Sequence, residues 1–312
     1  MIDVSVVIAT YNVAAYIEQA IASALRQEGV NIEIILVDDG STDATWSILE
    51  RQTDPRIKTF RLSQNSGPSV ARNKGFLEAT GKWIAILDGD DIYLPGRLAR
   101  CVALAEATGV QAVVDNLLMY YESGAPEKFM FDAKRFTQLH QLTLERLIRG
   151  TLSRFGGYPL GYVKPLFLAE FLRSHPLEYD PKIRIGEDYL LLAHALAFGA
   201  KCVVDPHAGY RYTVRKGSIS HKLDTASVDQ MLATDQLFLA RHQLTPAERK
   251  AQRMRTYLLK ENRAYVLLLL ALKRRSFLGV VQALAACPTA LRHLHQPLAL
   301  RLRKMLGLPT RT

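Results

Sequence analysis

One apolar run that ends abruptly in carboxylates constrains this chain more than any other feature. Residues 83–87 read Trp-Ile-Ala-Ile-Leu, and Asp88, Asp90 and Asp91 follow around a single glycine. Short apolar runs bounded by turn residues are typical of buried strands, and a parallel strand covered on both faces is apolar nearly throughout. Ligands of open parallel sheets bind at the carboxyl ends of the strands. The run therefore predicts a buried strand that delivers acidic side chains to a binding edge; a solvated Asp-Gly turn is the simpler alternative.

The preceding residues repeat the same design. Apolar strands alternate with helical patterns, which predicts βαβ units and a parallel sheet, with strands at 4–9, 32–37 and 57–62 and helices at 14–26, 44–52 and 69–79. Polar clusters follow the first two strands, at residues 10–12 and 38–39. Because parallel strands end at the same edge of a sheet, we expect these clusters to lie beside Asp88 to Asp91.

The middle of the chain continues as mixed helix and strand, and its last part is helical throughout. The pattern predicts helices at 95–108, 142–149 and 189–198, strands at 112–117, 201–204 and 209–213, and a hairpin or irregular excursion at 120–136. After residue 224 it predicts helices at 225–242, 246–273 and 276–287. The Gly- and aromatic-rich stretch 155–162 is either a structural turn or one wall of a ligand site. The basic loop 215–222 offers cations and backbone amides that suit phosphate groups.

Positive charge is concentrated at the carboxyl end of the chain. The net charge is +10, and the residues from Arg241 onward contain fifteen Lys/Arg against two Asp/Glu, which leaves the first 240 residues at −3. Anionic membrane surfaces and nucleic acids are the two obvious partners for such a tail. Its apolar run 264–272 is far shorter than the roughly 20 residues of a membrane span. A basic amphipathic helix predicts an element that lies on a membrane surface, and a core-packing helix is the alternative.

The cysteines point to no metal site and no disulfide framework. Cys101, Cys202 and Cys287 are scattered without CxxC spacing, so a reducing compartment is the simplest interpretation. The chain opens directly with a strand and no basic segment before it, and we therefore expect no signal peptide.

Six stretches, in this order, resemble the family 2 glycosyltransferases of the GT-A fold, and the details are similar to bacterial exopolysaccharide enzymes of the succinoglycan type. They are VSVVIATYN (4–12), EIILVDDGSTD (33–43), NSGPSVARNKG (65–75), GKWIAILDGDD (81–91), GEDYLL (186–191) and GSIS (217–220). The resemblance implies an α/β fold with a Rossmann-like, mostly parallel sheet flanked by helices. Residues 1–222 would form the nucleotide-sugar-binding and catalytic domain, and residues 223–312 a basic helical extension.

The resemblance also implies an activity. The family transfers a sugar with inversion from a nucleotide-diphosphate sugar, most often a UDP-sugar, with the help of Mn²⁺ or Mg²⁺. A hydroxyl of a lipid-linked or saccharide acceptor in exopolysaccharide synthesis would receive the sugar. Such an enzyme would work at the cytoplasmic face of the cell membrane, held there by its basic helical region.

Carried over residue by residue, the resemblance assigns the nucleotide site to the first strand ends. Thr10, Tyr11 and Asn12 would bind the donor nucleotide, with the Tyr11 ring stacking on the base. Asp39 would hydrogen-bond the uracil edge, and Arg72 lies in the stretch that flanks base and ribose.

The same resemblance assigns the reacting groups. Asp88 would face the ribose and a metal-bound water, Asp90 would bind the metal directly, and Asp188 would be the catalytic base with Glu187 as its acidic neighbour. Cations at 215–216, Arg215 and Lys216, would help neutralise the diphosphate. Many relatives carry a histidine at the position of Arg215, so the resemblance leaves the metal ligands open there.

Two other classes of protein fit parts of the pattern. A metal-dependent phosphoryl or nucleotidyl transferase would also use an Asp cluster, but it needs a Gly-rich phosphate loop with lysine at the first strand end, and residues 10–12 are not one. A nucleic-acid-binding protein would interleave aromatic and basic residues in the tail. Only Tyr257, Tyr265 and Phe277 follow Arg241, at spacings that suit helix packing, so we expect no nucleic-acid partner.

Overall fold

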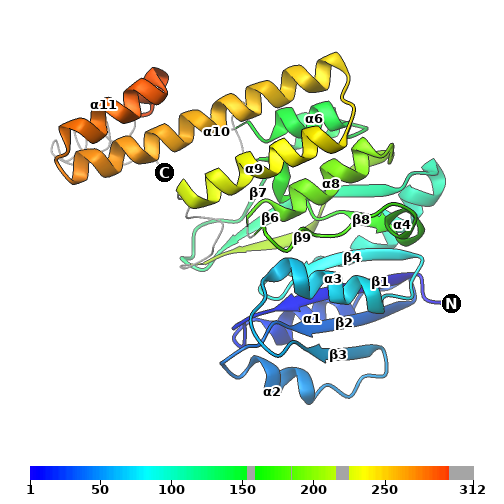
Figure 1. Cartoon of the computed structure of the whole chain (residues 1–312). Helices are drawn as coiled ribbons and strands as arrows, with labels where there is room; N and C mark the ends of the chain where they lie inside the picture. The colour runs from blue at the N-terminus through cyan, green and yellow to red at the C-terminus, as the bar shows by residue number, and fades with distance from the viewer. Residues whose placement is uncertain (153–158, 184, 216–224, 295–312) are drawn as a thin grey trace.

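A computed structural model describes residues 1–152, 159–183, 185–215 and 225–294 of the chain. The strands of these residues form one sheet in the order β3-β2-β1-β4-β8-β6-β9-β5, and β7 pairs with β6 at its side (Figure 1). The strands are β1 (Val4–Thr10), β2 (Ile32–Asp38), β3 (Ile57–Arg61), β4 (Trp83–Asp88), β5 (Ile92–Tyr93), β6 (Ala112–Tyr121), β7 (Lys128–Phe129), β8 (Leu166–Leu168) and β9 (Cys202–Val214).

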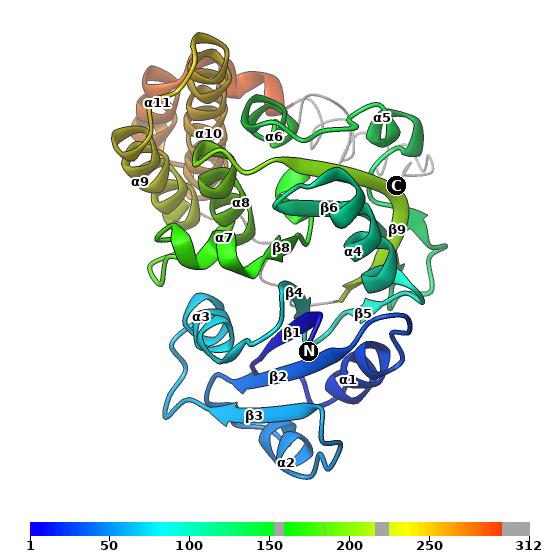
Figure 2. The same cartoon turned by 90° about the vertical axis from the view of Figure 1, so that its right-hand side faces the viewer.

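The first half of the sheet has the predicted parallel βαβ construction. β3, β2, β1 and β4 are mutually parallel, and the helices α1 (Ile17–Leu25), α2 (Thr45–Glu50) and α3 (Pro68–Glu78) connect them. Figure 2 shows α3 on one side of this sheet and α1 on the other. Strand residues such as Val6, Ile34 and Ile86 are fully buried, as expected for strands covered on both faces. The parallel βαβ units predicted from the alternation of apolar strands and helices are therefore present in this half.

The second half mixes strand directions. β8, which the sequence pattern did not predict, lies antiparallel between β4 and β6, whereas β6 and β9 run parallel to each other. At three residues, β8 is too short to give a periodic signal. The helices of this half are α4 (Arg97–Thr108), α5 (Ala133–Thr137), α6 (Leu144–Gly150), α7 (Ala169–Ser174) and α8 (Glu187–Ala197). The expected hairpin is present where β7 returns along β6.

One strand replaces the two that were predicted at 201–204 and 209–213. β9 runs through both stretches, and its pairing with β6 shifts register between Asp115 and Leu117. Pro206 cannot donate a ladder hydrogen bond, and the pattern therefore indicated a break. In the structure this residue lies in a β-bulge, and β9 continues to pair with β6 after the bulge.

The last helices pack against the preceding part of the chain. They are α9 (Thr225–Arg241), α10 (Pro246–Lys273) and α11 (Phe277–Ala286), and α10 packs on α9 and α6. A capping box of Thr245 and Glu248 begins α10. Phe238, Leu244 and Ala251 belong to the same buried cluster as the sheet, so the hydrophobic core crosses the predicted boundary at residue 222. The C-terminal end of α10 and the helix α11 project from the body (Figure 1).

A buried ion pair fixes the centre of the sheet. The Arg97 guanidinium donates two hydrogen bonds to the carboxylate of Asp115 of β6, from Nε at 2.7 Å and from Nη2 at 2.9 Å. Nη2 also donates to the main-chain oxygen of Lys164 at 2.6 Å, just before β8. Gly209 of β9 leaves the room for this pair, because a Cβ there would lie 2.2 Å from an Asp115 oxygen. The pair thus holds α4, β6 and the start of β8 together.

We predict that Arg97→Met lowers the free energy of unfolding by about 3–5 kcal/mol, because it leaves the Asp115 carboxylate buried without its partner. Urea unfolding of the purified protein measures the change. The control is Lys82→Met, which breaks an exposed pair with Glu106 and should cost less than about 1 kcal/mol. Equal losses in the two variants would contradict a structural role for the buried pair.

Candidate active site

The predicted polar clusters do meet at one edge of the sheet. Register pairs Thr10 of β1 with Asp38 of β2, and Ala9 of β1 with Asp88 of β4. These three parallel strands therefore deliver their polar ends side by side, as the sequence pattern indicated. The side chains at this edge fall into two groups, one around residues 10–12 and 39, and one around the carboxylates.

The loop after β1 exposes the ring of Tyr11, and its other polar residue, Asn12, bonds to the loop after β2. Tyr11 is 43% exposed, which suits the predicted stacking on a base. Thr10 is buried, and its hydroxyl lies 3.4 Å from Asp38. Asn12 adopts a positive φ of 51° and accepts from the amide of Thr42 at 2.8 Å, so it joins this loop to the loop after β2. Thr10 and Asn12 thus contact the end of β2 and the loop that follows it, and the nucleotide contacts predicted for them stay predictions.

Asp39 organises the loop that precedes α3. Its two carboxylate oxygens accept from the backbone amides of Ser66 and Gly67, at 2.7 and 2.8 Å. The Asp39 side chain is nearly inaccessible, with the residue 3% exposed. The predicted contact between Asp39 and a base edge is not tested by this geometry and stays a prediction.

The acidic end of β4 is neutralised by two buried cations. Asp88 accepts from Arg72 of α3 at 2.6 Å and from Lys164 at 2.6 Å. Burial alone would raise the pKa of Asp88, but the charges of Lys164 and Arg72 hold it well below its ordinary value. Asp88 is therefore an anion at neutral pH.

The other two carboxylates of the run point to different partners. Asp90 accepts from Arg215 Nε at 2.8 Å, and this guanidinium also lies over the ring of Tyr16. Burial and the charge of Asp88 raise the pKa of Asp90, although Arg215 opposes the shift. Asp91 turns toward β9 instead, where it accepts from the Tyr210 hydroxyl and the Thr213 amide, both at 2.7 Å. Asp91 thus anchors the strand end, and Asp88 and Asp90 remain as the pair that faces the binding edge.

The first turn of α8 brings a second acidic pair to the same place. Gly186 begins the helix at φ 87°, in the left-handed region that favours glycine. Arg72 donates to Glu187 at 2.8 Å and lies 3.5 Å from Asp188. Arg72 therefore stands between the carboxylates at the end of β4 and those at the start of α8. Burial and the charge of Asp188 raise the pKa of Glu187.

Lys164 joins the two acidic pairs directly. Its amino group lies 2.6 Å from Asp88 Oδ2 and 2.5 Å from Asp188 Oδ2. Burial would lower the pKa of Lys164, but Asp188 and Asp88 raise it above its ordinary value, so the side chain is charged. The other oxygen of Asp188 accepts from the Tyr179 hydroxyl at 2.9 Å. Both oxygens of Asp188 are thus oriented by donors.

Sequence reasoning missed Lys164 and Tyr179. The lone charge of Lys164 within the apolar stretch Leu160–Leu168 was the available signal, since a single cation in such a stretch is rarely buried without a partner. Tyr179 lies in an irregular segment and gave none. Lys216, the stretch 217–220 and residues 155–158 of the stretch 155–162 lie outside the described residues.

The carboxylates fit a divalent cation only together with a substrate. The described part of the chain holds no cluster of three or more His, Cys, Asp or Glu side chains able to bind a metal. Asp88 and Asp90 supply hard oxygen donors; burial and then the charge of Asp88 raise the pKa of Asp90, and a cation would offset the second of these effects. Mg²⁺ and Mn²⁺ commonly take one or two carboxylates and complete their shell with substrate phosphates. The donor set fits that arrangement.

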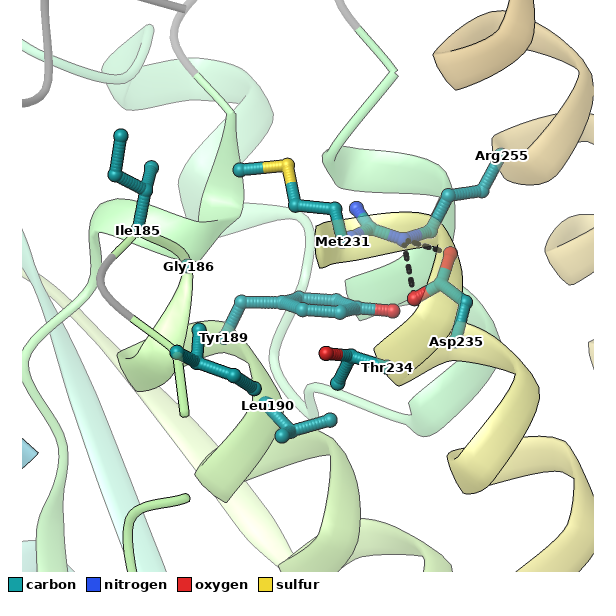
Figure 3. Close-up of a pocket in the computed structure, with 9 residues that line it drawn as sticks. Ile185, Gly186, Tyr189, Leu190, Met231, Thr234, Asp235 and Arg255 are labelled. Atoms are coloured by element: carbon teal, nitrogen blue, oxygen red, sulfur yellow. Dashed lines mark hydrogen bonds and ion pairs between the residues drawn. The ribbon is translucent and has the colours of Figure 1, made fainter. Parts of the chain in front are cut away.

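The pocket in Figure 3 lies elsewhere, between the start of α8 and the helices α9 and α10. Tyr189, Met231 and Arg255 are among its lining residues, and none of the predicted nucleotide-site residues is. The space open to water there is about 10 Å³, which holds one water molecule at most. This pocket is therefore no substrate site, and its role concerns packing.

We predict that Lys164→Met lowers the free energy of unfolding by about 3–5 kcal/mol, because two buried carboxylates then lose a counter-charge. Adding Asp188→Asn should recover part of the loss, since it removes one of those carboxylates. Urea unfolding of the two single variants and the double variant gives the coupling, which we expect to exceed about 0.5 kcal/mol. The control is Lys74→Met, whose exposed partner is Glu78. Strictly additive effects would show that Lys164 and Asp188 do not interact.

Comparison with known proteins agrees with this geometry. The sequence model of glycosyl transferase family 2 matches residues 5–164. The chain is 44% identical over 303 residues to the succinoglycan biosynthesis protein ExoO of Rhizobium meliloti. The aligned region covers 97% of this chain and 87% of that protein.

Two solved structures show the same fold. The TarS 1–349 fragment of S. aureus, in complex with UDP-GlcNAc, superposes with a TM-score of 0.65 at 18% identity over 90% of each chain. The mannosyltransferase PcManGT of Pyrobaculum calidifontis, in complex with GDP-Man and Mn²⁺, gives 0.64 at 18% identity over 97% of this chain and 83% of that one. The predicted α/β architecture of the GT-A type is confirmed. With its parallel strand ends and their carboxylates in place, the chain belongs to glycosyl transferase family 2 and is a glycosyltransferase.

Proposed function

We propose that the protein transfers a sugar, with inversion, from a nucleotide-diphosphate sugar to an acceptor hydroxyl in exopolysaccharide synthesis. The observation that carries this proposal is the meeting of Asp88 and Asp188 on one lysine, Lys164, at the strand ends. Asp88 would thereby lie beside the donor, and Asp188 would lie beside the acceptor hydroxyl. The likeness to a succinoglycan biosynthesis protein over 97% of the chain supports the pathway.

The donor is proposed to be a UDP-hexose bound across the ends of β1, β2 and β4. The exposed ring of Tyr11 supports base stacking, and Asp39 lies at the end of the neighbouring strand. TarS, which was solved with UDP-GlcNAc, supports a uridine nucleotide, whereas PcManGT was solved with GDP-Man. The choice between the two nucleotides rests on binding measurements.

A divalent cation is proposed to be held by Asp90 and Asp88 with the diphosphate of the donor. When bound, it would neutralise the negative charge that grows on the leaving diphosphate. Arg215 is positioned to share this task, because its guanidinium already lies at Asp90. Lys164 and Arg72 meanwhile hold the pKa of Asp88 below its ordinary value and orient the carboxylates of Asp88 and Asp188.

Asp188 is proposed to take the proton of the acceptor hydroxyl as that oxygen attacks the anomeric carbon. Inversion needs one such base and no second carboxylate as nucleophile, unlike a retaining hydrolase. The Tyr179 hydroxyl and the Lys164 amino group hold the Asp188 carboxylate in one orientation. Glu187 is held apart from it by Arg72.

The test is a calorimetric titration of the protein with UDP, with and without Mn²⁺. We expect binding that Mn²⁺ strengthens by at least about tenfold, and we expect Asp90→Ala to lose that gain because it removes a direct metal ligand. The control is Asp54→Ala, which removes a carboxylate paired with Arg56 on the surface and should leave the gain unchanged.

Each other outcome has a definite meaning. Binding of GDP but not of UDP would keep the transferase and change the donor. Binding of neither UDP, GDP nor dTDP would overturn the proposed nucleotide-sugar site. Transfer of a phosphoryl or nucleotidyl group, rather than release of UDP, would favour the phosphoryl-transferase alternative.

We further infer that the far end of α10 and α11 rests on an anionic membrane, where a lipid-linked acceptor would be available. Phe277 and Leu278 are 82% and 65% exposed, and the basic run 273–275 ends two positions before Phe277. Apolar side chains beside cations suit the interface of an anionic bilayer. No helix in the described ranges has both the length and the apolar character to cross a membrane.

We predict that Phe277→Ser combined with Leu278→Ser weakens binding to vesicles of phosphatidylglycerol by at least about tenfold, because burial of two large apolar side chains is lost. Vesicle co-sedimentation measures it, with neutral phosphatidylcholine vesicles for comparison. The matched control is Leu77→Ser, since Leu77 is also 82% exposed but lies on α3. If the double variant binds as the control does, this surface is not the membrane contact.

A further inference from the structure

We propose that Asp235 of α9 and Arg255 of α10 position the catalytic base, by clamping Tyr189 and with it the first turn of α8. The C-terminal helices would then belong to the catalytic apparatus itself. This inference rests on the proposed role of Asp188 as the base. Arg255 and Asp235 touch no reacting atom, and they act through Tyr189 as positioning residues.

The clamp consists of three buried side chains that meet at one point (Figure 3). Arg255 Nε lies 2.9 and 3.2 Å from the two oxygens of Asp235. The same guanidinium lies over the Tyr189 ring, 4.1 Å from its centroid. Its Nη1 donates to the Thr151 hydroxyl, at the end of α6, at 3.0 Å. One guanidinium therefore links α6, α8, α9 and α10.

These side chains have little room to move. Tyr189, Asp235 and Arg255 are 5%, 3% and 8% exposed, and the pocket beside them has space for one water molecule at most. A planar guanidinium bound by both carboxylate oxygens has a fixed orientation, and stacking on the ring fixes the tyrosine in turn. Side chains of α9 and α10 thus restrain the Tyr189 ring from outside α8.

The Tyr189 clamp acts on Asp188 because the two residues are neighbours in the first helical turn. Successive residues project about 100° apart around a helix, so fixing Tyr189 fixes the rotation at which Asp188 projects. Asp188 projects to Lys164 and Tyr179, while Tyr189 projects to Arg255. Gly186 precedes the turn with a positive φ, and a Cβ there would lie 3.5 Å from Met231 of α9.

A turn that starts at glycine without a side-chain cap is poorly fixed from its own sequence. No side-chain cap hydrogen bond is made by the residue that begins α8. External contacts must then supply the rigidity that catalysis needs, since misplacement by about 1 Å can cost about 100-fold in rate. Lys164 and Tyr179 supply such contacts on the side of Asp188, and the clamp from α9 and α10 supplies one on the side of Tyr189, about 100° further around the helix.

The chain offers a matched control for this clamp. Arg263 and Asp229 form a second ion pair between the same helices, α10 and α9, with side chains 40% and 49% exposed. Arg263→Met breaks a link between the two helices at the surface, whereas Arg255→Met also removes the contact with Tyr189. A difference between these variants therefore reports on the clamp and not on the joining of the helices.

The experiment compares the full-length protein with Arg255→Met, Arg263→Met and Tyr189→Leu. The first readout is UDP release from UDP-glucose, UDP-GlcNAc and UDP-galactose without added acceptor, and the second is the Kd of UDP with Mn²⁺. We expect kcat to fall about 10- to 100-fold in Arg255→Met and Tyr189→Leu while the Kd stays within about twofold. Arg263→Met should match the wild type, and Arg255→Lys should recover part of kcat because it keeps the charge near Asp235.

Hydrogen exchange of the peptide 185–192 provides a readout that does not depend on substrate. We expect its amides to exchange at least about tenfold faster in Tyr189→Leu, a variant that leaves the ion pair of Arg255 and Asp235 intact, and not in Arg263→Met. Equal exchange in all variants, or a fall of UDP affinity in parallel with kcat, would overturn the positioning role. Absence of UDP binding by the wild type would overturn the proposed function instead, and the exchange data would still decide whether the clamp holds α8.

Discussion

The contact of one buried lysine with two carboxylates is the interaction on which this site depends. Lys164 enters the structure just before β8 and binds Asp88 at the end of β4 and Asp188 at the start of α8. Without that charge, the buried carboxylates of Asp88 and Asp188 would share Arg72 as their remaining cation, which is strongly unfavourable. Arg97 holds the main chain of Lys164 in place, so the stability of the sheet and the arrangement of the site share one support.

In the first half of the chain, the local alternation of apolar strands and helices predicted the parallel sheet that the structure has. Apolar strands followed by polar residues at 10–12, 38–39 and 88–91 predicted both the parallel sheet and the edge where these residues meet, because period and strand direction decide both. Asp90 with Arg215, and Glu187 beside Asp188, also lie where the family resemblance implied a shared site. Which ligand each side chain contacts stays a prediction.

What the sequence did not reveal are contacts made across the sheet. β8 is three residues long and antiparallel, and its partners β4 and β6 lie far away in the chain, so no local period announces it. Lys164 and Tyr179 acquire their meaning only from that pairing. The same holds for β9, where Pro206 indicated a strand end that the bulge in fact absorbs.

The hydrophobic core that runs from the sheet into α9 and α10 has a consequence for hybrid enzymes. A chimera that joins the first 222 residues to the helices of another family member would place foreign side chains against Tyr189 and Thr151, which Arg255 contacts here. Phe238, Leu244 and Ala251 would also lose the side chains with which they share a buried cluster here. A chimera should therefore keep α9 and α10 together with the sheet of the same protein. The segment that can be exchanged begins nearer α11, whose main packing partners are α10 and the turn that follows α11.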